Sequence, residues 1–337
     1  MNSNKTETIE PFHSPWWCRG PHCQTLWPRL IRRQNRPALE RESLELPDSD
    51  FAELDWLQTS HNGPIVVILH GLEGSSDSHY IKGLLNLIAQ NTNWRAVVLH
   101  FRACGGKPNR KRHSYHAGQT EDVDYFIKRL QSEAPGADIA IVGYSLGGNV
   151  LLKWLGTHTV PENVKTAVAV SVPYELAKAT DRLNRGLSRL YQQVLLRSMR
   201  ETYCLKQKLI NLGVKKPLNK IKTIRDFDDK VIAFLNGFHG ADDYYQQSSS
   251  RQFLKKISTP TLLIHAKDDP FMVPDIVPGG DELSESTTLE CYDHGGHVGF
   301  VQGAWPWQAN YWLEKRIVAH LRSQLDQYGD QSFASYQ

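Results

Sequence analysis

The motif Gly-x-Ser-x-Gly at residues 143–147, centred on Ser145, constrains the fold of this chain more than any other feature of its sequence. It follows residues 137–142 (ADIAIV), which have the character of a buried strand, and it precedes a helical pattern over 146–156. A strand that turns sharply into a helix needs small flanking residues, because the two backbones approach closely. The motif therefore predicts a strained turn that exposes the Ser145 hydroxyl above a sheet.

Short apolar runs alternate with helical patterns from residue 64 to 174, which is typical of βα units and of a mostly parallel sheet. A strand, turn and strand over 40–57 come before them, and further strands and a final amphipathic helix come after residue 258. The remaining predicted strands are 65–69, 94–101, 166–172, 261–265 and 287–292, and the predicted helices are 78–90, 120–132 and 307–325.

The β pattern stops between residues 175 and 257, where the sequence is charged and helical. We expect a helical cap inserted here into an α/β core of residues 1–174 and 258–326, with 1–40 as an N-terminal extension and 327–337 as a flexible tail. Leu187, Leu190, Val194 and Leu195 predict a buried stripe on a cap helix.

A serine hydroxyl is a poor nucleophile until an imidazole takes its proton, and the imidazole needs a carboxylate to fix its tautomer. The acid is expected after a late strand, where residues 261–266 run into Asp268 and Asp269. Asp269 is favoured because Ala266 is the small residue three positions before it. Asp268 remains the alternative.

The histidine is expected in the loop 293–300, between the last strand and the last helix. His297 is favoured because Gly295 and Gly296 allow the loop to turn the ring towards Ser145. His294 is nearer the strand, and we expect packing to satisfy it.

A tetrahedral intermediate needs hydrogen-bond donors for its oxyanion. One donor is expected from the backbone N–H of Leu146, directly after the nucleophile, and another from the loop 70–74 (HGLEG) after an early strand. Leu72 is the candidate second donor, with Gly71 next.

The charge of the chain is nearly balanced, with 39 basic and 36 acidic residues and a net charge of +3, which argues against a nucleic-acid partner. The densest basic run, 110–113 (RKRH), is expected to be a solvated loop, with a patch for anionic head groups as the alternative. The five cysteines are odd in number and scattered, so neither a disulfide framework nor a paired zinc site is expected. A reducing, cytoplasmic location fits this cysteine usage.

No stretch approaches the roughly 18 apolar residues of a membrane-spanning helix, and residues 1–12 lack the apolar core of a signal peptide. The aromatic cluster Trp16, Trp17, Leu26 and Trp27 is expected to cover the core; contact with lipid is the alternative, so membrane contact is at most peripheral. The oligomeric state cannot be read from the sequence.

Several segments resemble the YheT-like esterases of the α/β-hydrolase superfamily, catalogued as AB hydrolase family 4. The resemblance runs over nearly the whole chain and is carried by 15–17 (PWW), 22–25 (HCQT), 70–74 (HGLEG), 101–110 (FRACGGKPNR), 115–122 (YHAGQTED) and 268–271 (DDPF). It implies an α/β-hydrolase fold, with helices on both faces of a mostly parallel sheet, and a charge relay on Ser145, Asp269 and His297. Ala103 stands where the family pattern has glycine, which affects none of these residues.

Motif and resemblance together predict a serine hydrolase that cleaves carboxylic esters with short to medium acyl chains, or lipid-like esters, without a cofactor or metal. An acyltransferase using the same triad and a catalytically silent binding module on the same fold remain the alternatives.

Overall fold

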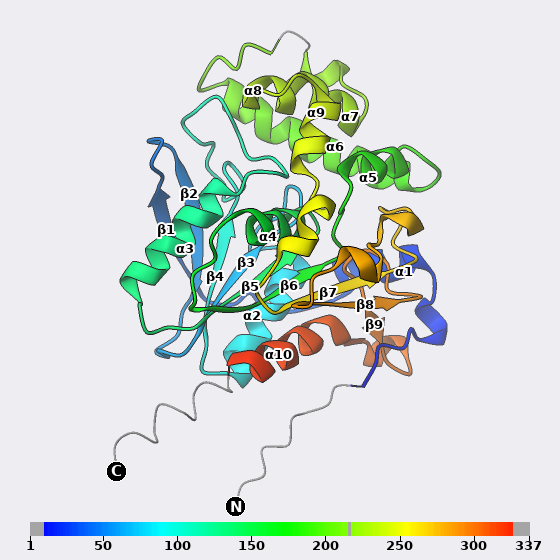
Figure 1. The fold of residues 1–337 in the computed structure, drawn as a ribbon. Coiled ribbons are helices and arrows are strands. Elements are labelled where there is room, and N and C mark those ends of the chain that lie inside the picture. Colours follow the sequence, from blue (N-terminus) through cyan, green and yellow to red (C-terminus); the bar gives the residue numbers. More distant parts are fainter. Residues whose placement is uncertain (1–9, 215–216, 326–337) are drawn as a thin grey trace, which may run out of the picture.

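A central sheet of eight strands organises the molecule (Figure 1). The computed structural model describes residues 10–214 and 217–325 of the 337-residue chain. The strand order is β1-β2-β4-β3-β5-β6-β7-β8, in which β2 is antiparallel to both neighbours and β3 to β8 pair in parallel. The strands are β1 (Leu39–Glu45), β2 (Phe51–Leu57), β3 (Ile65–Leu69), β4 (Arg95–His100), β5 (Ile139–Tyr144), β6 (Val164–Val170), β7 (Thr261–Ala266) and β8 (Thr287–Tyr292).

Alternation of side chains along the strands gives the sheet two apolar faces. On β3, Val66 and Ile68 face helices α2 (His79–Asn91) and α10 (Trp312–Leu325), while Val67 and Leu69 face α3 (Glu121–Glu133) and α4 (Leu146–Thr157). Helices therefore cover both faces, and the predicted mostly parallel α/β fold is confirmed.

The final helix begins later than the sequence pattern predicts. Residues 306–308 form a 3₁₀ turn, and β10 (Asn310–Tyr311) pairs with β9 (Val301–Gln302) before α10 starts at Trp312. Pro306 favours a turn at this point, and pairing with β9 gives the backbone of 310–311 an alternative to helical hydrogen bonds. The prediction of a helix over 307–311 was wrong.

Helices replace strands between β6 and β7, as predicted for residues 175–257, and they stand above the sheet in Figure 1. That these residues form a separate cap domain stays a prediction. The helices are α5 (Leu176–Leu183), α6 (Ser188–Gln207), α7 (Ile224–Phe227), α8 (Phe234–Asn236) and α9 (Ala241–Ser248), with a π-helical stretch at 228–233.

The buried face of α6 differs from the predicted stripe. Leu187, Leu190 and Val194 are exposed, with exposed fractions of 62%, 66% and 47%. The helix turns polar residues inward because they find partners there: the Ser188 hydroxyl donates to the Pro270 carbonyl. The inward positions of α6 are Ser188, Gln192, Leu196, Met199, Tyr203 and Lys206.

A disulfide joins Cys18, in a short 3₁₀ turn, to Cys23 in the first turn of α1 (Pro21–Leu30). The expectation that no cysteines pair was therefore wrong, because the turn that leads into α1 brings these two Cα atoms to 5.4 Å. The disulfide removes the cysteine-based argument for a reducing compartment, so the cytoplasmic location stays a prediction.

The N-terminal aromatic cluster is divided between contact and exposure. The rings of Trp17 and Trp27 pack with centroids 4.6 Å apart, whereas Trp16 is 66% exposed and contacts Trp305 edge-on. Core cover is thus seen for part of the cluster, and contact with lipid stays the untested alternative. Within 10–214 and 217–325, no helix is both long and apolar enough to cross a bilayer.

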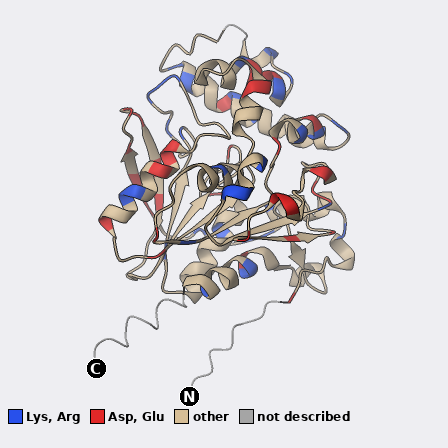
Figure 2. Ribbon diagram, in the orientation of Figure 1, with Lys and Arg blue, Asp and Glu red and all other residues tan. Residues whose placement is uncertain are grey.

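Acidic and basic residues are interspersed over the core and over the helices above it in the view of Figure 2. The predicted flexible tail, 327–337, lies outside the described residues.

Candidate active site

Ser145 lies in the sharp turn between β5 and α4, as its motif predicts. Its backbone dihedrals are φ 53° and ψ −118°, a conformation that costs a non-glycine residue about 1–3 kcal/mol. A Cβ atom on Gly147 would lie 2.5 Å from the carbonyl oxygens of both Leu69 and His70. Glycine is therefore required there, because only a bare backbone lets α4 start so close to the end of β3.

Ser145, His297 and Asp269 form one continuous hydrogen-bonded chain. His297 Nε2 lies 3.0 Å from Ser145 Oγ, and His297 Nδ1 lies 2.7 Å from Asp269 Oδ2. Asp269 is buried, and its second oxygen accepts the Phe271 N–H at 2.8 Å. The Phe271 ring stacks on the His297 ring with centroids 4.0 Å apart. The structure thus brings together the three residues that the sequence singled out.

The two alternative residues have other partners. Asp268 Oδ1 accepts the Gly296 N–H at 2.9 Å, and Asp268 Oδ2 lies 3.3 Å from Nδ1 of His294. Burial raises the pKa of Asp268. His294 is exposed rather than packed, contrary to expectation, because it follows β8 at the surface. Asp268 therefore holds the backbone of the histidine loop, while Asp269 holds the imidazole.

The candidate oxyanion donors are two backbone N–H groups, those of Leu146 and Leu72. Leu146 is the first residue of α4, so its N–H has no carbonyl partner within the helix. The Gly71 N–H donates to the Tyr80 hydroxyl at 3.0 Å, which leaves Leu72 as the better candidate in the loop after β3. Both leucines line the same cavity as Ser145.

The cavity has a volume of about 740 Å³ and opens between the sheet and the helices above it. Its walls carry apolar side chains from α5, α6 and α7, and arginines from α1 and the residues just after it. The apolar residues include Leu176, Leu183, Leu195, Met199 and Ile224, and the arginines are Arg29, Arg32 and Arg33.

Two acids also line this cavity, the buried Asp228 and the half-buried Glu73. Burial raises the pKa of Asp228 to about 7, although a hydrogen bond from the Tyr245 hydroxyl lowers it. Burial raises the pKa of Glu73 as well, although Glu73 accepts hydrogen bonds from Thr202 and Tyr115. Asp228 therefore carries less than a full negative charge near neutral pH.

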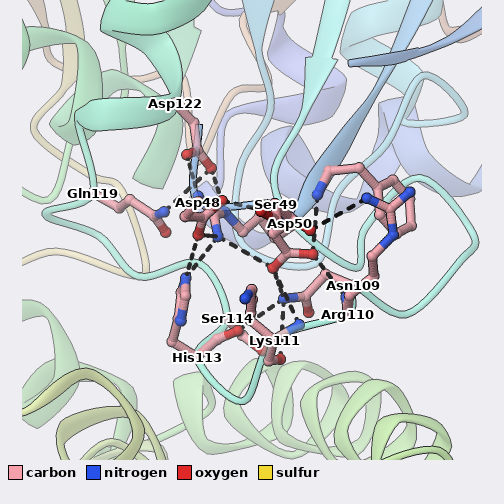
Figure 3. Close-up of polar contacts among 12 residues, drawn as sticks. Asp48, Ser49, Asp50, Asn109, Arg110, Lys111, His113, Ser114, Gln119 and Asp122 are labelled. Atoms are coloured by element: carbon pink, nitrogen blue, oxygen red, sulfur yellow. Dashed lines mark hydrogen bonds and ion pairs between the residues drawn. The ribbon is translucent and has the colours of Figure 1, made fainter. Parts of the chain in front are cut away.

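A separate polar cluster contains the one group of residues in the described ranges that are spaced as metal ligands, Asp48, Asp50 and His113. Figure 3 shows their contacts. The Arg102 guanidinium lies among them, with Nη1 2.6 Å from Asp48 Oδ2 and 3.2 Å from Asp50 Oδ2, and it forms two hydrogen bonds to Asp122. An arginine thus supplies the positive charge at this position, so the cluster is an ion-pair network within the protein.

The basic run 110–113 contributes to the same network. Arg110 forms a two-pronged ion pair with Glu45, and the Arg112 guanidinium donates to the carbonyl of Leu212. The run is therefore a loop, as expected, but the side chains of Arg110 and Arg112 bind other parts of the protein as well as facing solvent.

Sequence reasoning assigned no role to Gln24, Thr25 or Lys206. The Thr25 hydroxyl accepts the backbone N–H of His297 at 2.9 Å. Lys206 of α6 is fully buried and donates to the Ser114 hydroxyl and the His113 carbonyl, and burial lowers its pKa to about 7. The segment 22–25 was among the motifs of the family resemblance, which was the one available signal for Gln24 and Thr25.

Comparison with known proteins agrees with the architecture. Residues 64–304 match the sequence model of the family described as "alpha/beta hydrolase fold". The chain belongs to this α/β-hydrolase family.

Among its relatives, the chain is 41% identical over 314 residues to "Putative esterase YheT" of Escherichia coli (strain K12), over 90% of this chain and 91% of that protein. The predicted resemblance is thereby confirmed. It is also 27% identical over 313 residues to "Phospholipase ABHD3" of Mus musculus, over 90% of this chain and 76% of that protein. The crystal structure of the Pyrococcus furiosus esterase Pf2001 is similar with a TM-score of 0.55 and 17% identity, over 88% and 98% of the two chains, which supports the fold alone.

Proposed function

We propose that this protein is a carboxylic ester hydrolase in which Ser145 is the nucleophile, His297 the general base and acid, and Asp269 the carboxylate that orients the imidazole. The observation that carries this proposal is the unbroken chain of hydrogen bonds from Ser145 Oγ through both ring nitrogens of His297 to Asp269. Ser145 and His297 line a cavity of the size that small-molecule ligands occupy, roughly 300–1,000 Å³. Membership of an esterase-type family supports the same reaction.

In the proposed reaction Ser145 Oγ attacks the ester carbonyl carbon while His297 Nε2 takes the hydroxyl proton. The N–H groups of Leu72 and Leu146 donate to the oxyanion. The tetrahedral intermediate then expels the alcohol, which receives the proton from His297. Water then attacks the acyl-enzyme carbonyl while His297 takes its proton. As this second intermediate collapses, the bond between Ser145 Oγ and the acyl carbon breaks, Oγ takes the proton from His297, and the carboxylic acid leaves. None of these steps requires a cofactor.

The cavity favours an ester whose acyl chain is apolar. Leu176, Leu183 and Met199 provide a surface on which a short to medium acyl chain loses contact with water, at about 0.8 kcal/mol per buried CH₂ group. A lipid-like ester is compatible with the same wall, and the name of the relative "Phospholipase ABHD3" supports including it.

The test is turnover of p-nitrophenyl esters of increasing acyl length by wild type, Ser145→Ala and the control Ser323→Ala. Ser323 is a hydroxyl donor on α10, bonded to the His320 carbonyl. We expect turnover in wild type and Ser323→Ala and its loss by at least about 10³-fold in Ser145→Ala. Equal rates in wild type and Ser145→Ala would contradict the proposal.

Product analysis in water with added alcohol distinguishes the alternatives. Free acid as the main product supports hydrolysis, whereas a new ester as the main product identifies an acyltransferase with the same triad. A wild-type protein that is folded but turns over no ester is the result expected of a silent binding module.

A further inference from the structure

The loop that carries His297 contains residues other than glycine with positive φ values. Positive φ values occur at Gly295 (149°), Gly296 (60°), Val298 (55°) and Phe300 (46°). For a β-branched residue such as Val298 a positive φ is a genuine outlier, which persists only where surrounding structure imposes it. Contacts from outside the loop must therefore set its conformation.

Helix α1, far away in the sequence, provides part of those contacts, beside Asp268, which accepts the Gly296 N–H, and Ser171, whose hydroxyl accepts the Val298 N–H. The backbone N–H of His297 donates to Thr25 Oγ1 at 2.9 Å. Gln24 binds the backbone of Val301 twice, because its Oε1 accepts the Val301 N–H at 2.7 Å and its Nε2 donates to the Val301 carbonyl at 2.9 Å. Gln24 and Thr25 are both buried. These bonds hold the loop at the histidine itself and at a point four residues beyond it.

Gln24 and Thr25 are themselves fixed in place. The Thr25 hydroxyl donates to the Pro21 carbonyl at 2.7 Å, and Gln24 Nε2 also donates to the Cys18 carbonyl at 2.7 Å. The Thr25 hydroxyl thus forms two hydrogen bonds, as a donor within α1 and as an acceptor of the His297 backbone N–H.

Helix α1 and the loop that carries His297 also pack closely against each other. A Cβ atom on Gly299 would lie 2.2 Å from the Gln24 carbonyl oxygen, and one on Gly296 would lie 2.6 Å from the Pro21 carbonyl oxygen. The bare backbones of these glycines allow α1 to approach the loop closely enough for the hydrogen bonds.

We propose that Thr25 and Gln24 are positioning residues for His297, holding its backbone where the imidazole reaches Ser145 and Asp269 at the same time. The proposal rests on the esterase function proposed above. Because His297 must satisfy a 3.0 Å contact on one ring nitrogen and a 2.7 Å contact on the other, a shift of its backbone lengthens at least one of them. A displacement of about 1 Å in such a site costs on the order of 100-fold in rate.

The test compares Thr25→Val, which keeps the shape and removes the hydroxyl, with Thr25→Ser, which restores a hydroxyl. Thr92→Val is the matched control: the Thr92 hydroxyl also donates to a helix carbonyl, that of Ile88, and accepts a backbone N–H, that of Trp94. We expect kcat to fall by roughly 10- to 100-fold in Thr25→Val with KM nearly unchanged, and to recover in Thr25→Ser. We expect kcat of Thr92→Val to match wild type.

A second measurement is independent of turnover. The proton shared by His297 Nδ1 and Asp269 gives a low-field ¹H NMR signal when the hydrogen bond is intact, and we expect Thr25→Val to weaken or shift this signal while Thr92→Val leaves it unchanged. If Thr25→Val does not fold, Thr25→Ala is measured in its place.

Wild-type kcat and an unchanged low-field signal in Thr25→Val would overturn the inference, and so would a loss that Thr25→Ser fails to restore. Failure of the proposed function has a different result, because wild type would then turn over no ester, and the NMR comparison would still decide whether Thr25 positions His297.

Discussion

Replacing Asp269 with asparagine removes the charge of the relay while keeping its shape. Asp269 has one oxygen on the Phe271 N–H at 2.8 Å and the other on His297 Nδ1 at 2.7 Å. In Asp269→Asn the amide oxygen must stay on the Phe271 N–H, since the reverse orientation would set two donors against each other in a buried site. The amide NH₂ then faces Nδ1, which can accept it only when the ring proton is on Nε2.

That tautomer turns an N–H towards Ser145 and leaves His297 unable to take the serine proton. The expected loss in kcat is about 10³- to 10⁴-fold, equivalent to about 4–5.5 kcal/mol of transition-state stabilisation. The assay is steady-state hydrolysis of a p-nitrophenyl ester at neutral pH, with thermal unfolding recorded alongside to confirm that the variant is folded.

Asp268→Asn is the matched control, because Asp268 stands next to Asp269 and binds Gly296 and His294 instead of His297. We expect it to lose no more than about 10-fold in kcat, as for a weakened loop contact. A severe loss in Asp268→Asn together with near wild-type kcat in Asp269→Asn would contradict the role of Asp269 and assign the acid to Asp268.

Two further predictions concern the helices above the site. Leu196→Ala should lower the free energy of unfolding by about 2–5 kcal/mol because Leu196 is fully buried. Leu190→Ala, at a 66% exposed position, should change it by less than about 0.5 kcal/mol. Urea unfolding of both variants measures the difference, and equal values would contradict the observed buried face of α6. Burial lowers the pKa of Lys206 to about 7, so between about pH 7 and 10 the folded chain binds fewer protons than the unfolded chain and stability gains from rising pH. Wild type should therefore become more stable relative to Lys206→Met across this window, by about 1.4 kcal/mol per pH unit. A difference between the two proteins that is independent of pH in urea unfolding would argue against the lowered pKa of Lys206.

The sheet and the relay could be predicted because their signals are local. Strands β3 to β7 are short, mostly apolar runs, and the structure places β3 to β8 within a residue or two of expectation. Ser145, Asp269 and His297 each follow a strand, at the edge of a parallel sheet where such loops meet, so topology brings them together without any need to foresee side-chain packing.

The errors have a different origin, because they depend on contacts between distant segments. Leu190 and Val194 form an apolar pattern on α6, but the hydrogen bond of Ser188 to the Pro270 carbonyl turns another face inward. Likewise, Thr25 and His297 are 272 positions apart, and no spacing rule links a helix threonine to a loop that distant. The pairing of Cys18 with Cys23 depends on a turn that composition does not reveal.

The most direct test of Ser145 as the nucleophile is to treat wild type and Ser145→Ala with a fluorophosphonate and to locate the adduct by peptide mass spectrometry. We expect one phosphonate per wild-type chain, on Ser145, and none on Ser145→Ala. An adduct on another residue, or an unlabelled wild type that is folded, would contradict the assignment of Ser145 as an activated nucleophile.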